Sequence, residues 1–177
     1  MKRLPVMPQD EQDDWYQYYD QTHGDYLSFL EECECRCKAC QKMCRVVCKG
    51  TVEEMAELIT LGYGDRLMLY ENVFDVLMLQ PAYKGLESKQ STYYEIDSEG
   101  CTFWKGGSCE IHHVKPIEGR VAGHSAQIEL KSHLPLFLSL QWQQLEGQRL
   151  IKSWANEFLN EKIMEKTTWE RCWKWNV

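Results

Sequence analysis

The chain has 177 residues, enough for one ordinary domain with a sizeable core, and its formal net charge is −7. Its apolar share of 44% and charged share of 27% are near globular averages, which argues against wholesale disorder. The acidic balance disfavours nucleic-acid binding, because such binding needs clustered Lys and Arg.

An acidic segment rich in aromatic side chains occupies residues 1–32. The residues after Met1-Lys2-Arg3 lack the apolar run of a signal peptide, and no stretch of the chain approaches 18 apolar residues. We therefore expect a cytoplasmic protein without a membrane span, in a compartment where thiols stay reduced. Residues 14–30 are compatible with a short helix that packs its aromatic side chains on the core.

The densest chemical feature is a cluster of six cysteines within sixteen residues: Cys33, Cys35, Cys37, Cys40, Cys44 and Cys48. Thiols at this density are typical of metal ligands or disulfides. A reducing compartment and an odd total of nine cysteines favour metal ligands. The residues between the thiols are mostly charged, which argues against cysteines that merely pack on an apolar helix face.

The spacing of this first cluster leaves its conformation open. On a helix, five of the six cysteines would share one face over on the order of 20 Å, too far for a single ion. The segment is therefore either a helix that feeds two sites or a set of turns around metal. Cys37-x2-Cys40 has the knuckle spacing of a tetrahedral site, whereas Cys40-x3-Cys44 and Cys44-x3-Cys48 suit helical ligands. We favour a knuckle that enters a short helix.

A second cluster contains Cys101 and Cys109, which flank Lys105-Gly106-Gly107. This pattern predicts a β-hairpin with a glycine turn, whose ends would bring both thiols to one ion. Three histidines follow, His112, His113 and His124. If the strand continues past Cys109, alternation places His113 on the side of Cys109, whereas a bend would place His112 there.

The remaining pattern predicts several helices and short strands. Thr51 and Glu54 form a capping box for a helix over about 52–61, and Gly62 is its stop. Residues 66–70 form a further short element, 73–79 a buried strand ended by Pro81, and 91–96 another strand. Helices are expected over 134–144 and 145–163, the second with an apolar face of Leu150, Trp154, Phe158 and Leu159.

These elements predict an α+β fold, mainly helical with a small strand or hairpin element, knitted together by Cys and His metal sites. The expected organisation is an N-terminal segment 1–32, a cysteine-cluster core 33–125 and a C-terminal helical segment 126–177 packed on that core. The C-terminal tail is rich in tryptophan, which suits an aromatic plug over the core or a docking patch for a partner.

The candidate metal ligands are the eight clustered cysteines and two histidines. Structural zinc takes four Cys or Cys and His ligands, so two or three zinc ions would fit. An iron–sulfur cluster is the alternative, although the spacing C-x2-C-x3-C-x3-C matches neither ferredoxin pattern. The expected ligands are Cys33, Cys35, Cys37, Cys40, Cys44, Cys48, Cys101, Cys109, His112 and His124.

Templates for catalysis are weak in this sequence, and the nearest is a Cys/His pair of Cys109 with His112 or His113. The sequence has no G-x-S-x-G, no phosphate-binding G-x-x-x-x-G-K-[ST], no G-x-G-x-x-G and no H-E-x-x-H. We therefore expect a non-catalytic structural or recognition module with a protein partner. Three alternatives stay open: an iron–sulfur or metal-dependent enzyme, a metal-trafficking or sensing protein, and a small acidic inhibitor from a mobile element.

The two clusters together resemble a known family. The pattern C-x-F…C-x-I-[HY]…[RK]-P…R, downstream of a dense cysteine cluster, resembles the YkgJ-type cysteine-cluster family of zinc/iron-chelating domains. The matching residues are Cys37, Cys40, Cys44, Cys48, Cys101-Thr102-Phe103, Cys109-Glu110-Ile111-His112, Lys115-Pro116 and Arg120. The segment Gly62–Leu69 is similar to a bacterial subgroup, and the resemblance covers residues 33–125.

The resemblance implies metal binding and no particular reaction. This chain departs from the family in two places, since its first cluster has no adjacent cysteines and Gly119 stands where many members have a cysteine. The ligand missing at Gly119 would then be replaced by His112 or His124.

Overall fold

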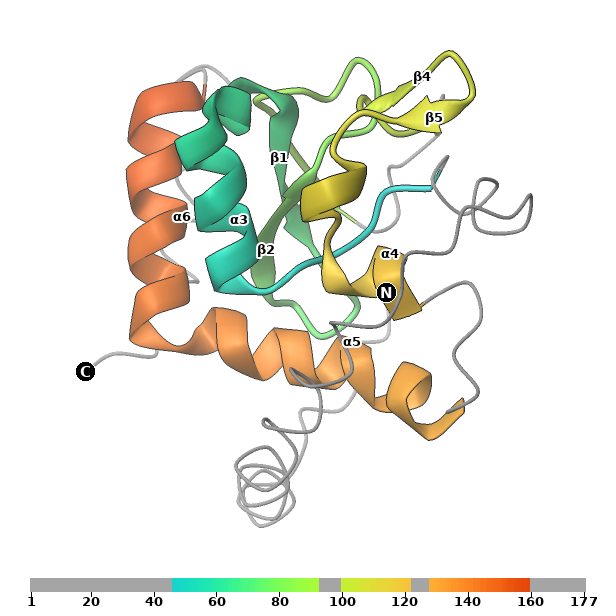
Figure 1. Cartoon of the computed structure of the whole chain (residues 1–177). Helices are drawn as coiled ribbons and strands as arrows, with labels where there is room; N and C mark the ends of the chain where they lie inside the picture. Colours follow the sequence, from blue (N-terminus) through green and yellow to red (C-terminus); the bar gives the residue numbers. More distant parts are fainter. Residues whose placement is uncertain (1–45, 93–99, 122–127, 160–177) are drawn as a thin grey trace, which may run out of the picture.

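The computed structural model describes residues 46–92, 100–121 and 128–159, and the side chains of residue 121 and of 128–133 are not described (Figure 1). Within these ranges the protein combines helices with two small sheets, so the predicted α+β class is confirmed. No helix in the described ranges is both long and apolar enough to cross a membrane. The α-helices and strands are α3 (Val52–Leu58), β1 (Leu67–Glu71), β2 (Leu77–Pro81), β3 (Gln90–Thr92), β4 (Trp104–Lys105), β5 (Ser108–Cys109), α4 (Ile117–Val121), α5 (Ile128–Gln143) and α6 (Leu145–Phe158).

Helix α3 begins at the predicted capping box. The Thr51 hydroxyl accepts from the Glu54 backbone nitrogen at 3.2 Å, and the Glu54 carboxylate accepts from the Thr51 nitrogen at 2.9 Å. Two orphan donors of the first turn are therefore satisfied. The helix continues as a π-helical turn over Ile59–Tyr63. Within it Gly62 adopts φ 85°, a conformation that glycine takes without a steric clash. The predicted stop at Gly62 is confirmed.

The three-stranded sheet has the order β2-β1-β3. Strand β1 pairs antiparallel with β2, with Leu69 opposite Leu79, and parallel with β3, with Tyr70 opposite Ser91. The predicted strand over 73–79 is wrong at its start, because the strand begins at Leu77. Residues 72–76 form the turn of a β1–β2 hairpin, in which the Asn72 side chain accepts from two backbone nitrogens. Strand β3 ends at Thr92, and the rest of the strand expected over 91–96 lies outside the described residues.

Strands β4 and β5 form the predicted glycine hairpin. Trp104 lies opposite Cys109 and Lys105 opposite Ser108, with Gly106 at φ 56° and Gly107 at φ 88° in the turn. Positive φ at both turn residues matches the right-handed twist of the strands, and glycine adopts it without a side-chain clash.

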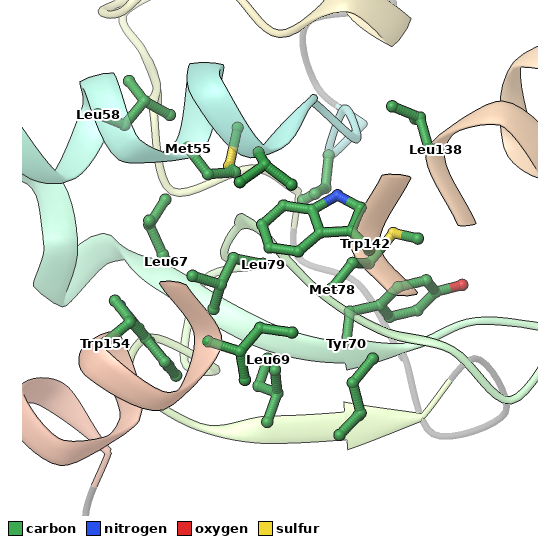
Figure 2. Close-up of a cluster of buried hydrophobic side chains, with 14 of the residues drawn as sticks. Met55, Leu58, Leu67, Leu69, Tyr70, Met78, Leu79, Leu138, Trp142 and Trp154 are labelled. Carbon is green, nitrogen blue, oxygen red and sulfur yellow. The ribbon is translucent and has the colours of Figure 1, made fainter. Parts of the chain in front are cut away.

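Helices α3, α5 and α6 pack on β2, and α3 runs beside α6 (Figure 1). Helix α5 begins at Ile128, earlier than expected, and α6 begins at the predicted Leu145, whereas residues 160–163 lie outside the described part. Of the predicted apolar face of α6, Trp154 and Leu159 are buried, whereas Leu150 and Phe158 are half-buried. Ile151 and Ala155, which were not predicted, complete the buried face. One apolar core joins all these elements. Figure 2 shows its side chains Met55, Leu58, Leu67, Leu69, Tyr70, Met78, Leu79, Leu138, Trp142 and Trp154.

Candidate metal centre

Cys48 lies in a non-helical segment that pairs with the start of α4. The backbone nitrogen of Lys49 donates to the Glu118 carboxylate at 2.6 Å, and the Glu118 nitrogen donates to the Lys49 carbonyl at 3.2 Å. The expected helix therefore does not reach Cys48. The backbone of the next residue, Lys49, is held by Glu118, which lies 69 positions away in sequence. The spacing of Cys44 and Cys48 predicted a helix, and at Cys48 this prediction is wrong.

The Cys48 thiol is buried against Gly119. A Cβ atom at residue 119 would stand 2.7 Å from the Cys48 sulfur, closer than real Cβ atoms come to a neighbour. Glycine at this position leaves room for the sulfur. The indole nitrogen of Trp142 donates to the Gly50 carbonyl at 3.0 Å and holds the segment two residues after Cys48.

Cys101, from the second cluster, lies beside Tyr83. Its backbone pairs with Tyr83 in an antiparallel bridge. The Thr102 nitrogen donates to the Ala82 carbonyl at 2.9 Å and the Lys84 nitrogen to the Gly100 carbonyl at 3.0 Å. The thiol is buried, with 5% of the residue exposed. These bonds fix Cys101 beside Tyr83.

Tyr83 pairs with Cys101, and its phenol is influenced by one described cysteine of each cluster. Burial raises the pKa of its phenol above the ordinary value, and the neighbouring Glu118, Cys101 and Cys48 raise that pKa further. All three groups are therefore close enough for their negative charge to oppose ionisation of the phenol. Cys48 and Cys101, which are 53 positions apart in the printed sequence, both lie in its surroundings.

Cys109 and the histidines do not follow the predicted alternation. The residue opposite Cys109 in the hairpin is Trp104, whereas Cys101 pairs with Tyr83, so the hairpin register does not place the two thiols opposite each other. The strand also ends at Cys109, and residues 112–114 form a 3-10 turn. Alternation along a strand therefore does not apply to His112, which is half-buried, or to His113, which is exposed.

Most of the predicted ligands lie outside the described residues: Cys33, Cys35, Cys37, Cys40, Cys44 and His124. Within 46–92, 100–121 and 128–159, no three His, Cys, Asp or Glu side chains are grouped in a way that would hold a metal ion. A complete four-ligand site would need residues from outside these ranges, so the described residues present two thiols near Tyr83 and not a finished site.

The Glu54 carboxylate joins two segments near Cys48, an arrangement that we call the carboxylate clasp and that was not predicted from the sequence. Besides capping α3, the Glu54 carboxylate accepts from the Ile117 backbone nitrogen at 3.0 Å and forms an ion pair with Arg120. Burial raises the pKa of Glu54, while the charge of Arg120 opposes that shift. The clasp joins the start of α3 to the start of α4, which carries Glu118 and Gly119. The sequence predicted the capping role of Glu54 but not its contacts with Ile117 and Arg120. The one available signal was that Arg120 belongs to the motif on which the family resemblance rests.

No protein-family model, curated protein or solved structure matches the chain. Its chemistry is therefore inferred from its own residues.

Proposed function

We propose that this chain is a cytoplasmic, non-catalytic zinc-binding protein in which Cys48 and Cys101 share one ion. The support is that Tyr83 pairs with Cys101 through its backbone, and that Cys48, from the other cluster, contributes with Cys101 to the raised pKa of the Tyr83 phenol. Two buried thiols from separate segments suit a borderline-soft cation such as zinc. Zinc shared between them would tie the segment before α3 to the segment before β4.

The chain can supply the remaining ligands of this ion. Cys44 precedes Cys48 by four residues, which extend to at most about 14 Å, so it lies within reach of the same site. Cys37 and Cys40 are the next candidates, with the knuckle spacing of a tetrahedral ion. Cys33 and Cys35 would serve a second ion, with Cys109, His112 and His124 as further ligands.

A structural zinc ion suits a recognition module. Its binding free energy contributes directly to folding, so it would knit the first cluster onto the α+β core. The acidic N-terminal segment and the tryptophan-rich tail are the candidate surfaces for a protein partner, since tryptophan is enriched in binding hot spots.

Elemental analysis of full-length protein purified anaerobically tests the proposal. We expect two or three zinc ions per chain and no visible chromophore. Cys48→Ser and Cys101→Ser should each lose one ion, and the double variant should lose the same single ion because both thiols bind it. Cys172 is the one cysteine of the sequence outside the two clusters, so Cys172→Ser is the thiol control and should keep all of the zinc. Losses that add up in the double variant would contradict a shared ion. Iron with charge-transfer absorption would favour the iron–sulfur alternative.

A further inference from the structure

Arg66 donates to the residue that follows each cysteine of the second cluster. Its Nη2 atom donates to the Thr102 carbonyl at 2.9 Å and to the Glu110 carboxylate at 2.9 Å. Thr102 follows Cys101 just before β4, and Glu110 follows Cys109 just after β5. One nitrogen of Arg66 therefore binds both ends of the hairpin, each end next to a thiol.

The guanidinium group of Arg66 is itself held in place. Its central carbon lies 4.0 Å from the centroid of the buried Phe103 ring and 5.7 Å from that of Tyr63. The Arg66 carbonyl accepts from the Ala82 nitrogen at 2.9 Å, and the Ala82 carbonyl accepts from the Thr102 nitrogen at 2.9 Å. A planar guanidinium stacked on an aromatic ring loses little further freedom when it donates hydrogen bonds. Arg66 is therefore a rigid support for Thr102, whose backbone is bonded at both its nitrogen and its oxygen.

Backbone bonds also bring Cys101 and Cys109 to neighbouring positions. The Trp104 nitrogen donates to the Cys101 carbonyl at 3.0 Å, and Trp104 pairs with Cys109 in the hairpin. Paired residues of antiparallel strands have Cα atoms about 4.5–5.5 Å apart. Cys101 belongs to the apolar core cluster, and Cys109 packs against that cluster. The two cysteines are not opposite each other, but they are neighbours through Trp104 and both contact the core.

We propose that Cys101 and Cys109 are a preformed two-thiol site for a thiophilic metal ion, and that Arg66 is the residue that positions them. Zinc belongs to this class of ion. The inference rests on the proposed function and deepens it, because it assigns Cys109 to the ion that Cys101 binds. Arg66 acts through Thr102 and Glu110 and is not a metal ligand, since its guanidinium stays protonated.

Phenylarsine oxide tests the pair in the reduced, zinc-free full-length protein. Its arsenic bonds to two neighbouring thiols, and its oxygen leaves as water with their two protons. Trypsin cleaves after Lys105, so Cys101 and Cys109 leave on peptides 90–105 and 106–120, each with one cysteine. With one arsenical per chain, we expect mass spectrometry to find most of the arsenic in these two peptides joined together.

Variants of Arg66 test its positioning role. Arg66→Met should lower the share of arsenic in the joined peptides by about tenfold, as loss of a residue that orients metal ligands lowers metal affinity. Arg66→Lys, which keeps a cationic donor, should retain a larger share. Arg149→Met is the control for an exposed arginine, and Trp142→Phe is the control for lost stability, because its indole donates to Gly50, outside the hairpin. Both controls should match the original chain.

An equal share of arsenic in Arg66→Met and the original chain would overturn the role of Arg66. If Arg66→Met does not fold, Glu110→Ala takes its place, because Glu110 is exposed and its removal breaks one of the two bonds. An unchanged share in that variant would overturn the same role. Arsenic that joins Cys101 or Cys109 to other cysteines would overturn the pair. Joined peptides from a chain that binds no zinc would overturn the proposed function alone, whereas zinc without joined peptides would overturn only this inference.

Discussion

The carboxylate of Glu54 accepts a hydrogen bond from the backbone nitrogen of Ile117, which lies 63 positions later in the sequence. The same carboxylate caps α3 and pairs with Arg120, so one half-buried group holds three partners. We expect Glu54→Ala to cost about 3–5 kcal/mol of unfolding free energy, because it strands a partly buried Arg120. Denaturant unfolding measures the loss. Glu57→Ala, an exposed substitution on the same helix, should change stability by less than about 0.5 kcal/mol. Equal losses in the two variants would contradict the clasp.

Gly119→Ala should weaken zinc binding more than it changes the fold. Helix propensity favours alanine over glycine by about 1 kcal/mol, which offsets part of the cost of moving Lys115 and Cys48. The metal-free stability should therefore change little, while the displaced sulfur lowers zinc affinity. The chelator competition assay measures that affinity. Gly62→Ala is the contrast, since it has open space but φ 85°, and should cost about 1 kcal/mol without affecting zinc.

Trp142 and Trp154 provide a matched pair of substitutions. Both are buried, and each indole donates to a glycine carbonyl, Trp142 to Gly50 at 3.0 Å and Trp154 to Gly64 at 2.7 Å. Replacement of either by Phe should cost about 1–3 kcal/mol, because a buried carbonyl loses its donor. Only Trp142→Phe should also lower zinc affinity, since Gly50 follows Cys48 by two positions. A similar drop in zinc affinity for Trp154→Phe would show that zinc binding follows the overall stability of the fold and not the bond from Trp142 to Gly50.

Glu110 should make stability depend on pH in the acid range. Hydrogen bonds from Arg66 and then Lys105 lower the pKa of Glu110 to about 2. A carboxyl with a lowered folded-state pKa stabilises the protein above pH 4.5 and loses that contribution as pH falls toward 2. About a third of the side chain is exposed, so solvent screening keeps the contribution under about 1 kcal/mol. The difference in unfolding free energy between the original chain and Glu110→Gln should shrink from pH 5 to pH 2.5. A constant difference would contradict the ion pairs.

Metal removal should loosen the domain. If zinc ties the first cysteine cluster to the core, a strong chelator should lower the melting temperature of the full chain, because binding free energy is also folding free energy. Re-addition of zinc should restore it. The Cys48→Ser variant, which lacks one ligand, should respond less to the chelator. An unchanged melting temperature in the original chain would argue against structural zinc.

Local features of this protein were predictable from sequence. The capping box at Thr51 and Glu54, the stop at Gly62 and the hairpin around Gly106 and Gly107 each depend on residues a few positions apart. The strand over 73–79 was misplaced because its apolar residues continue into a turn that Asn72 organises, and periodicity does not distinguish the two.

The sequence by itself determined the α+β class, the capped helix and the thiol-rich chemistry, because these follow from composition, periodicity and short spacings. Only the tertiary structure paired Cys101 with Tyr83, gave Glu54 its second role at Ile117 and placed Cys48 and Lys115 against Gly119. Such contacts join segments dozens of residues apart. They are decided by how the segments around Gly50 and α4 pack together, which no local pattern encodes.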